Sequence, residues 1–240
     1  MTARRSRAEN RAEMEARILQ LGREHLARHG AAALSLRAIA RDLGVASSAV
    51  YRYVDSRDAL LTLLLVDAYT SLADAVDHAV VQEDAPSDEA GLIEGAPLER
   101  LALAMRDWAI AHPAQWGLVY GAPVPGYRAP AERTTGPGTR VMRRLLEVIA
   151  ADPSAEAAAS SAQNPDVRPA EYEAFLAASA EELGVEATPV QAAAAVRAWS
   201  AIVGTISMEL HGQLGPEPAA SPALGRAILL DAVAALTPER

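Results

Sequence analysis

The segment 35–54, SLRAIARDLGVASSAVYRYV, constrains the fold of this 240-residue chain more than any other. Three of its residues have the spacing of two short packed helices. Ala40 is small enough for the helices to cross, Gly44 can take the left-handed backbone of a tight turn, and Val50 is an apolar plug that seats the second helix. The first helix also has apolar residues at i, i+3 and i+7, namely Leu36, Ile39 and Leu43. The pattern therefore predicts a helix-turn-helix.

The rest of the chain also has a helical pattern, with no sustained strand period. Ser35 and Ser56 stand where N-caps are expected. Loops are predicted at 82–97 and 121–138, where Pro and Gly cluster, and the composition of 151–169 is typical of disorder. Helices are expected over about 10–30, 36–44, 47–54, 57–81, 98–111, 113–120, 139–150, 170–183, 189–213 and 222–236. The predicted fold class is all-α.

Charge is unevenly distributed along the chain. The net charge is −9, but residues 1–60 hold 11 arginines against seven acidic residues, a local net charge of +4. The other 180 residues carry a net charge of −13. A basic head on an acidic body confines the attraction for phosphate to one end of the chain. Together with the helix-turn-helix pattern, this distribution predicts a DNA-binding protein.

Two stretches resemble the N-terminal DNA-binding domain of the tetracycline-repressor (TetR) family: LSLRAIARDLGVASSAVYRYVDSRDALL and, before it, the helical pattern ARILQLGREHLARHG. The resemblance covers about residues 10–65, with two departures. Ala46 stands where many relatives have a capping Ser, so we expect Ser47 to cap the recognition helix one residue late. Val54 replaces a frequent Phe, which should only thin the small core.

The C-terminal part resembles a subgroup of the same family that has a Trp-x-x-x-His-Gly helix. Pro113 and Trp116, followed by GAPVPGYRAP at 121–130, are similar to a loop of that subgroup. In the stretch AWSAIVGTISMELHGQL, Val203 stands where the subgroup has its His. The residues that match the subgroup's helix are Trp199, Gly204 and Glu209.

The resemblance implies a three-helix helix-turn-helix DNA-binding domain over 1–55, with a basic N-terminal arm over 1–9. It implies a larger helical effector-binding and dimerisation domain over 56–240. The protein is predicted to be a repressor that binds a palindromic operator as a homodimer and is released by a small-molecule effector. A transcriptional activator on the same fold is one alternative. Another is a helical small-molecule-binding enzyme or carrier whose basic head is incidental.

The recognition helix is expected to present one face to DNA. On a helical wheel Val50 and Val54 point inward, so Ser48 and Arg52 point outward, where an arginine can bind guanine in the major groove. Flanking residues and helix N-termini are better placed for phosphates. The predicted DNA-contacting residues are Ser35, Arg37, Ser47, Ser48, Tyr51, Arg52, Tyr53 and Arg57. Further phosphate or minor-groove contacts are expected from the arm, through Arg4, Arg5 and Arg7.

The resemblance also implies that helices 170–183 and 189–213 dock as an intermolecular four-helix bundle. An apolar stripe with small residues suits such an interface, and its members are Ala192, Ala195, Trp199, Ile202 and Ile206. The alternative is that this stripe belongs to the core of the single chain.

An effector pocket is likewise implied in the larger domain. Its predicted lining consists of Tyr69, Trp108, His112, Trp116, Tyr120, Phe175, Trp199 and Met208, and core packing is the alternative for each. A lining that is apolar and aromatic predicts a hydrophobic, ring-bearing effector rather than a sugar or a nucleotide.

The sequence predicts no enzyme, metal site or membrane segment. His25 and His29 have the i, i+4 spacing that can hold a metal, but no third ligand recurs nearby, and histidines on a helix surface are far commoner. Phosphate-loop, dinucleotide and Gly-x-Ser-x-Gly motifs are absent, and so is cysteine. No uncharged apolar run approaches the roughly 18 residues of a membrane span, and no signal-peptide core follows the N-terminus. We therefore expect a cytoplasmic protein without a cofactor.

Overall fold

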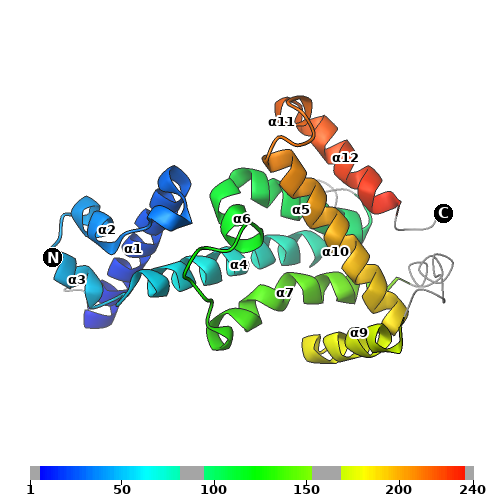
Figure 1. The fold of residues 1–240 in the computed structure, drawn as a ribbon, viewed down its shortest axis with the longest axis horizontal. Helices are drawn as coiled ribbons and strands as arrows, with labels where there is room; N and C mark the ends of the chain where they lie inside the picture. The colour runs from blue at the N-terminus through cyan, green and yellow to red at the C-terminus, as the bar shows by residue number, and fades with distance from the viewer. Residues whose placement is uncertain (1–5, 82–94, 153–168, 236–240) are drawn as a thin grey trace. The chain divides into compact units, whose positions relative to one another are not determined.

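The computed structural model describes residues 6–81, 95–152 and 169–235, which form helices joined by turns and loops, with no strand among them (Figure 1). This confirms the all-α fold class. In chain order the elements are α1 (Arg7–His29), η1 (Ala31–Ala33), α2 (Leu36–Leu43), α3 (Ser47–Tyr51), α4 (Arg57–Val81), α5 (Pro97–Ala111), α6 (Pro113–Tyr120), α7 (Ala131–Ala150), α9 (Ala170–Leu183), α10 (Pro189–Leu210), α11 (Glu217–Ala220) and α12 (Pro222–Ala234).

The helices divide into two compact units. Unit 1 comprises Met1–Thr70 and His112–Gly138, and unit 2 comprises Ser71–Ala111 and Thr139–Arg240. Helices α4 and α7 contribute residues to both units. The boundary predicted from the sequence, between residues 55 and 56, falls inside unit 1. The helix-turn-helix therefore shares its unit with the start of α4, with α6 and with the start of α7.

Unit 1 is built on the helix-turn-helix. Ala40 and Val50 are buried, as the motif predicts. Gly44 has φ +70° and ψ 28°, and its N–H donates to the carbonyl oxygens of Ala40 and Arg41. Only glycine adopts this left-handed backbone without strain, so the turn depends on Gly44. The helices pack on an apolar core that includes Ile18, Leu26, Leu36, Ile39, Leu43, Leu60, Leu61 and Leu64.

Local capping decides where two helices of this unit begin. Helix α1 begins about three residues earlier than predicted because Ser6 and Glu9 form a capping box. Ser6 Oγ accepts from the N–H of Glu9 at 3.1 Å, and the Glu9 carboxylate accepts from the N–H of Ser6 at 2.6 Å. The cap predicted for α4 is confirmed, since Ser56 Oγ accepts from the N–H of Ala59 at 3.0 Å.

Helix α3 differs from its prediction at both ends. Ser47 is the first residue of the helix rather than its cap, and the N-cap position belongs to Ala46, which has extended backbone and no side-chain acceptor. The expectation that Ser47 caps this helix is therefore wrong. The helix also ends at Tyr51, three residues before the predicted end, and continues as a turn in which the N–H groups of Tyr53 and Val54 donate to the carbonyl oxygen of Val50.

Helix α6 and the segment after it pack on the core of unit 1. Helix α6 spans the range that the sequence predicts, and its Leu118 is partly buried against this core. Val124 and Tyr127, from the following loop, pack against the same core. The Tyr127 hydroxyl lies 2.9 Å from the Thr62 hydroxyl on α4. Residues far from the motif in sequence therefore complete the unit that carries it.

Helix α7 begins eight residues before its predicted start. The sequence places a loop over 121–138 because of its prolines and glycines, yet α7 runs through Pro137. The helix is started by Pro130, whose carbonyl oxygen accepts from the N–H groups of Arg133 and Thr134 and, at 2.9 Å, from the Thr134 hydroxyl. A Cβ at Gly138 would lie 3.2 Å from the ring of Tyr69 on α4. Tertiary packing of α7 on α4 thus overrides the local preference of Pro and Gly.

Unit 2 has its core where α5, α10 and α12 pack together, and α9 packs on α10. Helix α10 begins at a capping box formed by Thr188 and Gln191. Buried residues on these helices are Leu101, Met105, Leu176, Ile202, Leu229 and Val233.

The stripe that the sequence assigns to a dimer interface lies in this core. Its members Ala192, Ala195, Ile202 and Ile206 are buried within the single chain, and Trp199 is half-buried. A residue enclosed by its own chain cannot face a second copy. The prediction of a dimer interface from this stripe is therefore wrong, and its alternative, the core of the single chain, is confirmed.

Helix α4 is the one helix of the described residues that is long and apolar enough to cross a membrane by length and composition. Half of its apolar window is buried inside the protein. Core helices of soluble proteins meet the same criterion of length and composition.

Candidate nucleic-acid interface

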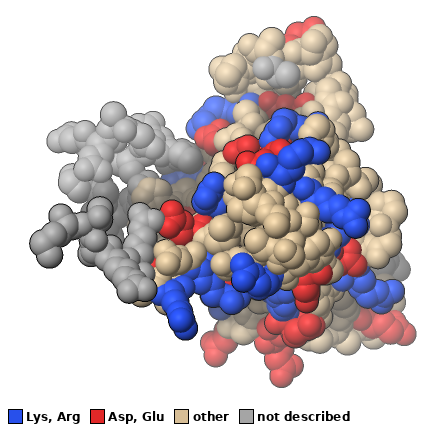
Figure 2. Space-filling model, turned by 90° about the vertical axis from the view of Figure 1, so that its left-hand side faces the viewer, with Lys and Arg blue, Asp and Glu red and all other residues tan. Residues whose placement is uncertain are grey.

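Helix α3 has one buried face and one exposed face. Val50 and Val54 are buried in the core of unit 1, whereas Ser48, Tyr51 and Arg52 are exposed. Many arginine side chains gather on the face that lies at the left of Figure 1, with carboxylates between them (Figure 2). The predicted separation of an inward and an outward face on α3 is therefore present in the structure.

A polar cleft of about 270 Å³ lies beside α3 in unit 1. Its lining consists of Tyr51, Arg52, Tyr53, Val54, Asp55, Ala59, Leu63 and Arg133. Arg133 comes from the first turn of α7, which the sequence places in a loop. Sequence reasoning missed Arg133 because no periodicity or motif connects it to the helix-turn-helix. Two arginines and two tyrosines in one polar cleft are suited to phosphate oxygens.

The predicted phosphate-contacting residues differ in whether their side chains are already bound within the protein. Ser35 is the N-cap residue of α2, but its side chain makes no capping hydrogen bond, and Arg37 is exposed in the first turn. Arg57 instead donates from Nη2 to the carbonyl oxygens of Ala31 at 3.0 Å and Ala32 at 3.3 Å. Arg57 thus holds the short helix η1 against the start of α4.

The other two predicted residues lie at the edges of α3. Ser47 is half-buried in the first turn of the helix. The Tyr53 ring is partly buried against the core, and the Arg11 guanidinium lies over it, with Cζ 5.6 Å from the ring centroid. Tyr53 therefore combines packing with a position at the edge of the polar cleft.

A buried histidine joins α1 to the helix-turn-helix. His25 Nε2 lies 2.7 Å from Asp42 Oδ2 on α2, and this hydrogen bond lowers the pKa of Asp42 below its usual value. The expectation of a surface histidine is wrong at position 25. The ring of His29 meets that of His25 edge-on at 5.8 Å. Among the described residues no group of three or more His, Cys, Asp or Glu side chains has the geometry for a metal ion.

A second polar contact ties α1 to α4 and α6. Arg23 donates from Nε and Nη2 to the two carboxylate oxygens of Asp67, each at 2.8 Å, which raises the pKa of Arg23. Gln115 on α6 donates to the same carboxylate at 3.4 Å. Bidentate pairs of this kind fix geometry as well as charge. The contact therefore holds α1 in a defined position on α4.

The residues predicted to line an effector pocket belong to different units. In unit 1, Trp116 is buried and its ring meets that of Tyr120 edge-on at 4.5 Å. Burial raises the pKa of Tyr120 above its usual value, and Tyr69 and His112 are half-buried. The unit 2 members of the set are Trp108, Phe175, Trp199 and Met208.

The unit 2 members have contrasting surroundings. Trp108 is buried and donates from Nε1 to Ser71 Oγ at 3.0 Å. Trp199 is half-buried. Phe175 is 59% exposed and Met208 is 40% exposed, so both present apolar surface to solvent. A cavity of about 350 Å³ in unit 2 is lined by residues outside the predicted set.

Comparisons with known proteins agree with this geometry. Residues 18–64 match the model of the bacterial regulatory proteins of the tetR family, and residues 98–232 match that of the tetracyclin repressor-like C-terminal domain. HTH-type transcriptional regulators of Mycobacterium tuberculosis and Mycobacterium bovis are 44% identical over 216 residues, which are 90% of this chain and 88% of theirs. These domains and relatives are those of transcriptional regulators, not enzymes. The finer assignment to the Trp-x-x-x-His-Gly subgroup stays a prediction.

Solved structures show the same fold. The crystal structure of SCO4313 is 32% identical with a TM-score of 0.71, covering 96% of this chain and 100% of that chain. The TetR family transcriptional regulator PfmR from Thermus thermophilus has a TM-score of 0.51 at 17% identity, covering 93% of this chain and 100% of that one.

Proposed function

This chain belongs to the TetR family of bacterial transcriptional regulators, and we propose that it is a cytoplasmic repressor that binds a palindromic operator as a homodimer and leaves it when a small molecule binds. The observation that carries the proposal is the orientation of α3. Val50 and Val54 seat this helix on unit 1, while Ser48 and Arg52 face solvent. A short helix held in this way is suited to the major groove.

Base reading is assigned to Ser48 and Arg52. A guanidinium can donate two hydrogen bonds to O6 and N7 of one guanine, which no other base pair offers in the same place. A two-fold symmetric protein meets two half-sites whose centres lie about 34–36 Å apart, one helical turn of DNA. The proposed operator is therefore a palindrome with one guanine read by Arg52 in each half.

Phosphate contacts are assigned to residues around the reading helix. Tyr51 and Arg133 line the polar cleft beside Arg52, and Ser35 and Arg37 stand at the start of α2. The N-terminus of a helix attracts anions through its N–H groups and its dipole, which supports the last two. Arg57 is assigned a supporting role, because its guanidinium is already bound to carbonyl oxygens.

The homodimer is proposed to form through the outer faces of α9 and α10. Three exposed apolar side chains support this: Phe175 on α9, 59% exposed, and Val196 and Met208 on α10, 38% and 40% exposed. Aromatic and methionine side chains are enriched in the buried centres of interfaces. This surface replaces the buried stripe that the sequence suggested.

The effector is proposed to be small and hydrophobic. It releases DNA only if it binds a DNA-incompetent conformation more tightly than the competent one. We propose that effector binding acts on the helix-turn-helix through α6, because α6 belongs to unit 1 and packs on α1. The eight residues predicted from the sequence as its lining remain a prediction.

Selection of bound fragments from random double-stranded DNA tests this function. The purified protein is expected to enrich one motif with two-fold symmetry. Its affinity should fall with salt, because phosphate contacts release counterions. Failure to enrich any motif at low salt would overturn the proposal, and an enriched motif without two-fold symmetry would overturn the homodimeric arrangement.

A further inference from the structure

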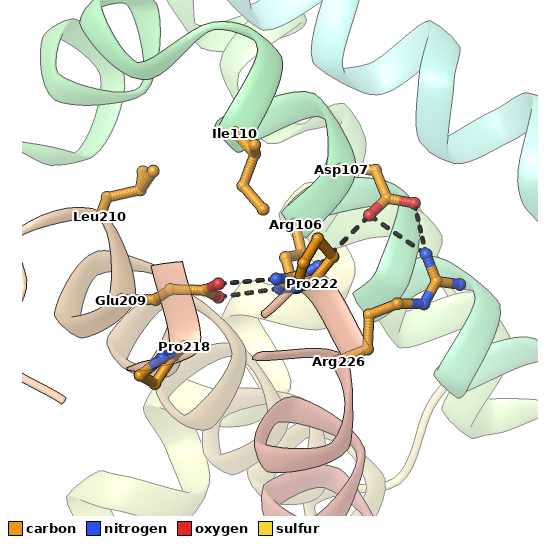
Figure 3. Close-up of a pocket in the computed structure, with 8 residues that line it drawn as sticks. All are labelled: Arg106, Asp107, Ile110, Glu209, Leu210, Pro218, Pro222 and Arg226. Carbon is orange, nitrogen blue, oxygen red and sulfur yellow. Dashed lines mark hydrogen bonds and ion pairs between the residues drawn. The ribbon is translucent and has the colours of Figure 1, made fainter. Parts of the chain in front are cut away.

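The cavity of about 350 Å³ in unit 2 lies between the end of α5, the end of α10, and the helices α11 and α12. Its lining residues are Arg106, Asp107, Ile110, Glu209, Leu210, Pro218, Pro222 and Arg226 (Figure 3). Four of these side chains are apolar and the other four are charged. The volume is at the lower end of the range for small-molecule sites.

The charged residues of the cavity balance each other. Arg106 donates to Glu209 from Nε at 2.8 Å and from Nη2 at 2.6 Å, and both side chains are buried. Arg226 donates to Asp107 at 2.9 Å in a more exposed position. Two cations facing two anions give the lining no net charge. An ionised ligand would bring an unbalanced charge into a lining that has none, and taking that charge out of water is costly.

One buried donor of this lining has no hydrogen bond to any described residue. Arg106 is 2% exposed, and its Nη1 group makes only a 3.6 Å contact with Asp107 Oδ1 in the described part of the chain. This separation is longer than a hydrogen bond. A buried donor without an acceptor carries its full desolvation cost, so an acceptor placed at Nη1 would gain from satisfying it.

The wall that α12 forms packs closely on the ion pair between Arg106 and Glu209. A Cβ added at Gly225 would collide with Arg106 Nη2 and Glu209 Oε1. The backbone of α12 therefore lies directly against the ion pair, and only glycine permits that approach. Arg226, the next residue, reaches Asp107 on α5. The ion pairs from Arg106 to Glu209 and from Arg226 to Asp107 thus tie α10 and α12 to α5 around the cavity, and a preformed lining lowers the cost of ordering a site for a ligand.

We propose that this cavity binds a small, neutral, largely apolar molecule that presents one hydrogen-bond acceptor, such as a ketone or ester oxygen, to Nη1 of Arg106. The apolar part of the molecule packs against Ile110, Leu210 and the two prolines. The further step, that this molecule is the effector, rests on the proposed function. Arg106 and Ile110 lie on α5, and only His112 separates the end of α5 from α6, which belongs to the DNA-reading unit.

Isothermal titration calorimetry with three matched probes tests the assignment. 2-Acetylnaphthalene offers a neutral acceptor, 2-ethylnaphthalene has the same shape without one, and 2-naphthoate is charged. We expect the ketone to bind about fivefold to tenfold more tightly than the hydrocarbon, the effect of one hydrogen bond. We also expect it to bind more tightly than the carboxylate. Equal binding of ketone and hydrocarbon, tighter binding of the carboxylate, or no binding of any probe would overturn the proposal.

Two variants place the binding in this cavity. Ile110→Trp fills it from a side chain that is 46% exposed, so the core needs no rearrangement. Leu224→Trp makes the same kind of change at a 40% exposed residue of α12 outside the lining. Ile110→Trp should weaken ketone binding at least tenfold, whereas Leu224→Trp should leave it within twofold. Unchanged binding by Ile110→Trp, with wild-type thermal unfolding, would overturn the assignment.

DNA binding is measured separately on the selected operator. Release of that operator by 2-acetylnaphthalene in the wild type, but not in Ile110→Trp, supports the effector role of the cavity. Ketone binding without release would overturn that role while leaving the site itself supported. A wild type that binds ketone but no DNA sequence would instead contradict the proposed function.

Discussion

At the scale of single residues, the arginines of unit 1 differ in what they already bind. Arg23 is paired with Asp67, and Arg57 donates to the carbonyl oxygens of Ala31 and Ala32. The side chains of Arg52 and Arg133 make no hydrogen bond or ion pair with any residue that the structure describes. An arginine with no partner among the described residues can turn its donors to DNA without losing any of the bonds that the structure shows.

Replacing Arg52 by alanine should reduce both affinity and base preference. We expect a loss of about 1–3 kcal/mol in operator binding and a relaxed preference at one base pair in each half-site. Competition binding with operators varied one base pair at a time measures both effects. Arg143→Ala, an exposed change on α7 in unit 2, is the control and should bind as the wild type. Unchanged base preference in Arg52→Ala would refute the proposed orientation of α3 toward DNA.

Replacing Arg57 by alanine should act mainly on stability. Its hydrogen bonds to Ala31 and Ala32 hold η1, so we expect a loss of about 1–2 kcal/mol in the free energy of unfolding. Replacing Arg133, which makes no such bond, should instead leave the free energy of unfolding unchanged. It should weaken binding to all DNA sequences alike and lower the slope of log affinity against log salt concentration by about 1 per half-site. Chemical denaturation and salt titrations of binding separate the two. A loss of stability in the Arg133 variant, with a loss of DNA binding alone in Arg57→Ala, would show that the two arginines have the opposite roles.

At the scale of secondary-structure elements, α7 shows tertiary packing that prevails over local preference. Its first turns contain Gly136, Pro137 and Gly138, each unfavourable inside a helix. The two glycines differ in their surroundings. A Cβ at Gly136 would meet no atom within 4 Å, whereas one at Gly138 would meet the ring of Tyr69 at 3.2 Å.

Matched substitutions of these glycines should have opposite effects. Gly136→Ala is expected to stabilise the protein by about 0.5–1 kcal/mol, because alanine favours a helix and reduces the freedom of the unfolded chain. Gly138→Ala gains the same preference but forces Tyr69 aside, so we expect a net loss of about 1 kcal/mol. Urea unfolding midpoints measure the difference. Equal stabilisation by both variants would show that Tyr69 yields without cost.

The hydrogen bond between His25 and Asp42 joins the elements α1 and α2. It lowers the folded-state pKa of Asp42, so its stabilisation is complete above the ordinary pKa of aspartate, about 3.9, and is lost as pH falls through the lower folded value. Asp42→Asn should therefore be less stable than the wild type at neutral pH, and the difference should vanish in acid. Denaturant midpoints from pH 7 down to pH 2 test this.

A control for that prediction uses the partner side chain. In a His25→Ala background, Asp42→Asn should cause no further loss, because the two substitutions remove the same bond. A difference that persists at low pH, or additive losses in the double variant, would assign the effect of Asp42 to some other contact.

At the scale of the whole molecule, substitutions at exposed and at buried residues of α9 and α10 should have different effects on dimerisation and folding. Phe175→Arg is expected to yield a folded monomer, because a guanidinium would be desolvated at the proposed interface. Ile202→Arg should prevent folding, because Ile202 is enclosed by its own chain. Light scattering gives the mass, and thermal unfolding reports on the fold. A Phe175→Arg protein that remains dimeric would place the interface elsewhere.

Features of this protein that depend on near neighbours in the chain follow from the sequence. The left-handed turn at Gly44, the cap at Ser56 and the inward face of α3 at Val50 and Val54 are set by residues within a turn or two of each other. Such interactions hold in any fold that contains the segment. The position of this helix and the exposure of Ser48 and Arg52 could therefore be predicted from the sequence.

Other features depend on residues distant in sequence, and only the tertiary structure decided them. Arg106 pairs with Glu209, which is 103 positions away in the sequence. Helix α7 continues through Pro137 because it packs on α4 at Gly138, and Arg133 lines the cleft beside α3. The stripe around Ile202 has the same periodicity whether it faces its own core or a second copy. Helical spacing tells which residues share a face, but only packing tells what covers that face.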